Sequence, residues 1–156
     1  METNISSRQL LLMAMVSFIP WTTSEAKTEK PSIDIWKSPT CGCCHDWMAH
    51  MEKNGFQFKT IHNDGNDDIR KKLGIAIQYG SCHTALINGY ALEGHVPAKE
   101  VHRLLREKPS AIGLTVPAMP VGSPGMDGPE YGGRKDKYQV LLIDKNGRTQ
   151  IYQSYN

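Results

Sequence analysis

The chain has 156 residues, 18 basic and 16 acidic residues, a net charge of +2 at neutral pH, and four cysteines. This length suits one domain, and the scattered charges, with no basic stripe or interleaved aromatic residues, argue against a nucleic-acid partner. A chain of this size can bury a core without disulfide cross-links. The four cysteines, which occur in two places, are therefore better explained by chemistry than by scaffolding.

The N-terminus has the pattern of an export signal. Arg8 precedes an apolar run over residues 10–19, and small residues within positions 24–26 fit a cleavage site. An apolar run this short does not span a bilayer, which takes about 20 residues, so an uncleaved membrane anchor is the less favoured alternative. We expect a signal peptide over residues 1–26, a single periplasmic domain over residues 27–156, and no membrane attachment after cleavage.

Hydrophobic periodicity and turn residues predict alternating strands and helices in the first two thirds of the mature chain. The predicted order, β-α-β-α-β-β-α, is that of the thioredoxin fold, an α/β architecture. The predicted elements are strands at 33–36, 56–61, 81–87 and 90–93, a helix after Cys41 that ends at 54–55, and helices at 69–73 and 98–107.

The last third of the chain is predicted to contain a long loop and a β-hairpin. Residues 112–131 form a long Gly/Pro-rich stretch that contains Met119 and Met126, and so long a loop is either functional or disordered. Two further strands, 138–143 and 148–152, flank a turn and predict a C-terminal β-hairpin added to the sheet or to its edge.

Three of the four cysteines lie in one turn between the first strand and the first helix. A Cys-x-x-Cys turn at this place is typical of a thioredoxin-like redox or metal site, because N–H groups at a helix start favour thiolate over thiol. Cys41 and Cys44 lie on one side of the helix start and can share a bond or a metal ion. Cys43 adds a third sulfur, which would produce wrong disulfides in a redox pair but is useful to a metal cluster.

The fourth cysteine, Cys82, lies at the start of the predicted third strand. In a thioredoxin-like fold this position lies against the Cys-x-x-Cys turn, and a proline with a cis peptide bond usually occupies it. Here Cys82 and His83 occupy it instead. If the fold assignment holds, all four thiols converge.

The motifs CGCCHDW, SCHTALINGYALEGHVPAKEVHRLLREKP and GLTVPAMPVGSPGMDG, in this order, resemble those of the CopG-type family of exported copper-resistance proteins. The resemblance runs over about residues 33–152. It implies a thioredoxin-like domain that binds several Cu(I) ions through the sulfurs of the four cysteines, and it leaves copper redox chemistry open as an addition. One departure is Ala118, where the family usually has glycine. This change affects the loop backbone but removes no ligand.

Cu(I) is a soft ion that takes thiolate and thioether ligands, with imidazole at the margin. The alternative is two structural disulfides, which an oxidising compartment permits but which adjacent cysteines would strain. The expected primary ligands are Cys41, Cys43, Cys44 and Cys82.

Five further side chains are candidates for a secondary role. The two methionines of the long loop either ligate copper or cover the site as an apolar lid. The three histidines complete a coordination shell, donate a hydrogen bond to a ligand, or are ordinary structural histidines. These candidates are Met119, Met126, His45, His83 and His95.

The leading interpretation is a periplasmic protein that sequesters or hands on Cu(I), with copper ions and other periplasmic copper-handling proteins as partners. The alternative is a thiol-disulfide oxidoreductase, with Cys41 as nucleophile and Cys44 as resolving thiol. A zinc site built from the same cysteines is a third. Cys43 and the methionine loop argue against the oxidoreductase, and the thioethers and adjacent cysteines argue against zinc. Storage, delivery and copper redox conversion stay open, and with them the question of enzymatic activity.

Overall fold

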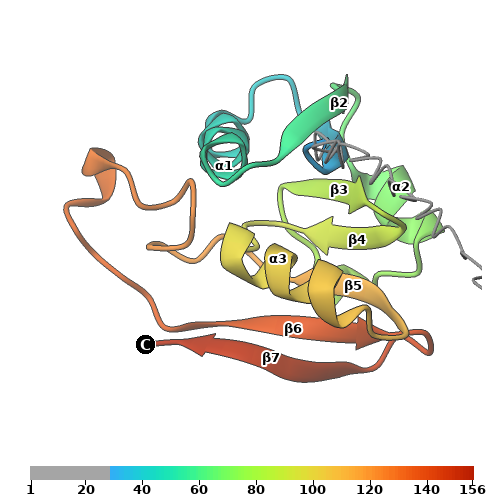
Figure 1. The fold of residues 1–156 in the computed structure, drawn as a ribbon. Helices are drawn as coiled ribbons and strands as arrows, with labels where there is room; N and C mark the ends of the chain where they lie inside the picture. The colour runs from blue at the N-terminus through green and yellow to red at the C-terminus, as the bar shows by residue number, and fades with distance from the viewer. Residues whose placement is uncertain (1–28) are drawn as a thin grey trace, which may run out of the picture.

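Figure 1 shows the computed structural model of the chain, which describes residues 29–156. The expected signal peptide therefore lies outside the described residues. Within them, no helix is long and apolar enough to cross a membrane. The elements are β1 (Ser32–Lys37), α1 (Gly42–Lys53), β2 (Gln57–His62), α2 (Asp67–Lys72), η1 (Ile77–Tyr79), β3 (His83–Ile87), β4 (Tyr90–Glu93), α3 (Ala98–Glu107), β5 (Ala111–Thr115), η2 (Pro129–Tyr131), β6 (Tyr138–Asp144) and β7 (Thr149–Tyr155).

A seven-stranded mixed sheet, in the order β2-β1-β3-β4-β5-β6-β7, organises this part of the chain. β1 pairs parallel with β2 and antiparallel with β3, and β3 pairs antiparallel with β4. The α/β class and the succession of strands and helices from β1 to α3 agree with the sequence prediction. The boundaries differ by one or two residues, as is usual at element ends.

The prediction that residues 112–131 form one continuous loop is wrong at its beginning. Ala111–Thr115 is β5, which pairs parallel with β4 and antiparallel with β6. Gly113 made this segment look like a loop, but a Cβ at Gly113 would lie 1.8 Å from the Ala91 carbonyl oxygen of β4. Glycine is therefore needed where the two strands approach closely. The predicted C-terminal hairpin is confirmed: β6 joins the sheet through β5, and β7 is the edge strand.

The main hydrophobic core lies between the sheet and the helices α1 and α3. The first of these helices contributes Trp47 and Met51, both with no exposed surface, and the second contributes Val101 and Leu104. The alternating burial of β1, in which Ile33 and other odd-numbered residues are buried, points one face of the strand into this core. The core fixes α1 over the sheet, and thereby the cysteines at its first turn.

Candidate metal centre

Three cysteines lie at the start of α1. Cys41 is the residue before the helix and has extended backbone dihedrals, with φ −75° and ψ 94°. Cys43 and Cys44 follow in the first turn, and Cys44 is fully buried while the other two are half-buried. The N–H groups of this first turn have no intrahelical acceptor and give the cysteines a positive local field.

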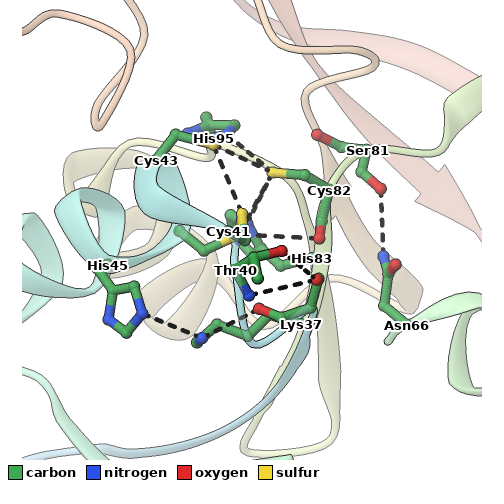
Figure 2. The surroundings of a disulfide bond; sticks show 12 residues. Lys37, Thr40, Cys41, Cys43, His45, Asn66, Ser81, Cys82, His83 and His95 are labelled. Carbon is green, nitrogen blue, oxygen red and sulfur yellow. Dashed lines mark hydrogen bonds between the residues drawn. A yellow bond between two sulfur atoms is a disulfide. The ribbon is translucent and has the colours of Figure 1, made fainter. Parts of the chain in front are cut away.

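The pairing of β1 with β3 brings the fourth cysteine to the same place. Lys37, the last residue of β1, lies opposite His83, the first residue of β3. Cys82 precedes β3 and therefore faces the turn that leads from β1 into α1. The Sγ atom of Cys82 lies 3.6 Å from that of Cys44 and 3.8 Å from that of Cys43. Figure 2 shows this convergence, and the four sulfur atoms all lie within 4.8 Å of one another.

Two of the four cysteines are joined in this structure. Cys41 and Cys44 form a disulfide, while Cys43 and Cys82 are free thiols. The sulfur of Cys43 lies 3.6 Å from that of Cys41, so the free thiol is in contact with the disulfide. The alternative of two structural disulfides is not what the structure contains. The cluster holds one disulfide and two thiols.

Burial changes the acidity of the fourth thiol. Burial, and secondarily the neighbouring Cys43, raise the pKa of Cys82 to about 12. Cys82 is therefore a thiol at neutral pH in the metal-free protein, in contrast to the thiolate that a helix start favours. A metal ion that binds there has to displace a proton, which makes binding stronger as the pH rises.

His95 is well placed to serve as a ligand. Its Nε2 lies 3.1 Å from the sulfur of Cys82, and its Nδ1 donates a hydrogen bond of 2.8 Å to the carbonyl oxygen of Pro124. This second contact puts the proton on Nδ1 and leaves the Nε2 lone pair directed at the sulfur cluster. Burial lowers the pKa of His95, which keeps the ring neutral and able to ligate.

His83 is buried beside the cluster. Its Nδ1 lies 3.4 Å from the sulfur of Cys82, its ring contacts that of Trp47 with centroids 4.4 Å apart, and its Nε2 has no hydrogen-bond partner among the described residues. Burial, followed by the nearby His95, lowers the pKa of His83 well below its usual value. His83 is thus a neutral imidazole whose Nδ1 lies beside the sulfur of Cys82.

His45 is not brought into the cluster. It is exposed, and its Nε2 accepts a hydrogen bond of 3.2 Å from the Nζ atom of Lys37, on the side of the turn away from Cys82 (Figure 2). Adjacent residues on a helix point in directions about 100° apart, so a histidine that follows a buried cysteine faces elsewhere. Of the three candidate histidines, the structure places His83 and His95 beside the thiols.

The two candidate methionines occupy different environments. Met119 is 48% exposed and lines an open groove with residues of β6 and the C-terminus. Met126 is buried, and its sulfur accepts a hydrogen bond of 3.3 Å from the hydroxyl of Tyr131. The residue before it, Gly125, packs directly on α1 at Cys43. Met126 therefore directly follows the residue that contacts the helix turn of Cys43, whereas Met119 lies on the groove.

The loop that carries these methionines is held in place at both sides of the site. Ala118 donates its N–H to the carbonyl of Gly80 and accepts a hydrogen bond from the Ser81 hydroxyl, just before Cys82. Its φ of +60° lies in the left-handed region that favours glycine. Further on, Pro124 contacts His95 as described above. These contacts describe an ordered loop that packs against the site, and not a disordered one.

Two buried charged residues near the site were missed by the sequence analysis. Glu93 has no exposed surface and accepts hydrogen bonds from the Ser81 N–H at 2.7 Å and from Arg70 at 3.3 Å. Burial raises the pKa of Glu93, and this effect outweighs the hydrogen bonds and the Arg70 charge, which favour the carboxylate. Lys37 is 1% exposed and donates to the Ser38 carbonyl and to His45. Each is the charged last residue of its strand, Lys37 of β1 and Glu93 of β4.

Comparisons with known proteins agree with this chemistry. A family model described as "Protein of unknown function, DUF411" matches residues 79–126. A solved structure named copper resistance protein CopG, Form 2, is 41% identical, with a TM-score of 0.75, over 82% of this chain and 100% of its own. Another, named Form 1, is 41% identical, with a TM-score of 0.74, over 81% of this chain and 98% of its own. The search of curated proteins found no match.

Proposed function

Because this chain belongs to the family of copper resistance proteins named CopG, we propose that it is a periplasmic protein that holds several Cu(I) ions on cysteine thiolates. The single observation that carries the proposal is the convergence of four sulfur atoms within 4.8 Å of one another. Sulfur donors select soft ions such as Cu(I), and the neutral nitrogen of His95 suits the same ion. Copper here is cargo, and its storage or delivery contributes to copper resistance.

The fold assignment that accompanies this proposal is thioredoxin-like. It is supported by the strand order β2-β1-β3-β4, by the parallel pairing of β1 with β2, and by the position of the Cys-x-x-Cys turn between β1 and α1. Cys82 then occupies the place that a cis-proline fills in thioredoxins. The periplasmic location rests on the export pattern of residues 1–26, and other periplasmic copper-handling proteins are the expected donors or acceptors of copper.

Titration of the fully reduced protein tests the copper proposal. We expect more than one Cu(I) per chain, because four thiolates exceed what one two- or three-coordinate Cu(I) needs. The measurement is competition against a chromophoric Cu(I) chelator under anaerobic conditions, with zinc as a comparison ion. A stoichiometry of one or less in the reduced protein would exclude a multi-copper site.

One observation favours a second candidate, a thiol-disulfide oxidoreductase. The disulfide joins the half-buried Cys41 to the fully buried Cys44 at a helix start, which suits an accessible nucleophile and a protected resolving thiol. In such an exchange the Cys41 thiolate attacks a substrate disulfide, and Cys44 then displaces the reduced substrate from the mixed disulfide. The thiols would also be able to pass electrons to bound copper, which would make the protein a copper oxidoreductase.

Replacing Cys43 by serine separates the two candidates. Cys43 is outside the Cys41–Cys44 pair but contacts Cys41 and Cys82 through sulfur. We therefore expect Cys43→Ser to lower the Cu(I) stoichiometry of the reduced protein while leaving any reduction of insulin disulfides within about 2-fold of wild type. Full copper loading of the variant would remove Cys43 from the copper site and favour the oxidoreductase.

A further inference from the structure

The disulfide leaves some of the possible metal ligands of the site free. With Cys41 and Cys44 joined, the thiols of Cys43 and Cys82 remain free, and the Nε2 lone pair of His95 remains directed at Cys82. Figure 2 shows the sulfur of Cys82 pointing toward both Cys43 and His95. The oxidised protein therefore places the free thiol of Cys43 and two histidine nitrogens, Nε2 of His95 and Nδ1 of His83, next to the sulfur of Cys82.

The spacing of the two free thiols matches that of sulfurs that share one metal ion. Two metal–sulfur bonds of about 2.3 Å at a tetrahedral to trigonal angle separate the sulfur atoms by about 3.8–4.0 Å. The Sγ atoms of Cys43 and Cys82 lie 3.8 Å apart. For a sulfur and a nitrogen on one ion the expected separation is about 3.6 Å. Cys82 and His95, at 3.1 Å, need to open by only a few tenths of an ångström.

The nitrogen donor is also fixed in orientation before any ion arrives. The carbonyl of Pro124 accepts the Nδ1 proton of His95, and Gly125, the next residue, packs against the backbone of α1 at Cys43 and Trp47. The same loop thus locks His95 and lies on the helix turn that carries Cys43. Such support from a neighbouring acceptor is what a ligating histidine usually has.

We propose that the disulfide form binds a single Cu(I) ion through Cys43, Cys82 and His95, and that reduction of the Cys41–Cys44 disulfide converts this one-ion site into the multi-copper site. The inference rests on the proposed function, since the same cluster is involved. In the conversion, a dithiol reductant gives up two electrons and two protons, its own disulfide forms, and Cys41 and Cys44 become thiols. The redox state of one cysteine pair then sets the copper capacity of the protein.

The test compares the two redox forms of the mature protein. The disulfide form is verified by a titration that finds two free thiols per chain, and Cu(I) is added anaerobically as its acetonitrile complex, without a thiol reductant. We expect one Cu(I) per chain in this form and more than one after reduction. We also expect the bound ion to protect both Cys43 and Cys82 from alkylation, as read by mass spectrometry.

Replacing His95 tests the nitrogen ligand. We expect His95→Gln to weaken Cu(I) binding by the disulfide form at least about 10-fold. The matched control is His102→Gln, since His102 is exposed and donates its Nε2 proton to the Asn54 carbonyl, away from the cluster. Equal affinity of His95→Gln and wild type would overturn the ligand assignment. If His95→Gln does not fold, an X-ray absorption spectrum of the Cu(I)-loaded disulfide form reads the nitrogen neighbour directly, and a spectrum with sulfur neighbours alone would overturn the ligand assignment.

The two proposals fail in different ways. If the reduced protein binds several ions and the disulfide form binds none, this inference is overturned and the proposed function stands. If the reduced protein binds no more than one ion, the proposed function fails. If bound Cu(I) protects only one of Cys43 and Cys82 from alkylation, the two thiols do not share an ion, and the inference is overturned.

Discussion

Replacing Cys82 by serine is expected to reduce the copper content of the reduced protein from several Cu(I) ions to no more than one. Cys82 is the thiol whose sulfur contacts donors from both halves of the site, at 3.6 Å from Cys44 and 3.1 Å from His95. Without it, the remaining sulfurs all lie on the first turn of one helix. Loss of a direct ligand should weaken binding by at least about 100-fold, the upper end of what indirect partners contribute.

This experiment separates ligation from folding. Serine is nearly isosteric with cysteine and Cys82 is only half-buried, so we expect the free energy of unfolding to change by no more than about 1 kcal/mol. Stoichiometry is measured by chelator competition, and stability by urea denaturation of the metal-free protein. A Cys82→Ser variant that keeps the wild-type copper number would show that Cys82 is not a ligand.

Replacing Gly125 by alanine is expected to destabilise the protein and weaken copper binding together. Gly125 has φ +83°, and a Cβ there would lie 2.6 Å from the carbonyl oxygen of Cys43 and 2.6 Å from the backbone nitrogen of Trp47. Both are backbone atoms of a helix packed on the core and cannot move aside. The loop has to lift, which removes the Pro124 carbonyl from His95. We expect a loss of about 2–4 kcal/mol in the free energy of unfolding.

Gly133 provides the matched control. It has φ +77°, similar to that of Gly125, but a Cβ there meets no atom within 4 Å. Gly133→Ala therefore carries the cost of the left-handed backbone alone, about 1–2 kcal/mol, and should leave copper affinity unchanged. Equal losses of stability and copper affinity in the two variants would show that the close approach of the loop to α1 does not matter.

Local features of the sequence were sufficient for much of the fold. The strand β1, the cysteine turn and the helix α1 follow from an apolar run, a Cys-rich turn and a helical stripe that ends at an Asn-Gly pair. Their positions depend on interactions between residues close in the chain, so periodicity and turn chemistry predict them. The β4 and β5 strands show the contrast. Both are short, but β5 contains Gly113, and only its pairing with β4 explains why glycine is required there.

The residues of the site also fall into those that local sequence places and those that only the tertiary structure places. The sequence by itself determined that three sulfurs lie at a helix start, because those cysteines are neighbours in one turn. The sequence placed Cys82 with them only on the assumption of a thioredoxin-like fold, and the tertiary structure decided it through the antiparallel pairing of β1 with β3. It also decided between the histidines: His45 follows a cysteine yet faces Lys37, whereas His95, thirteen residues beyond Cys82, contacts its sulfur. Contacts between distant residues are set by sheet register and loop packing, which no local pattern encodes.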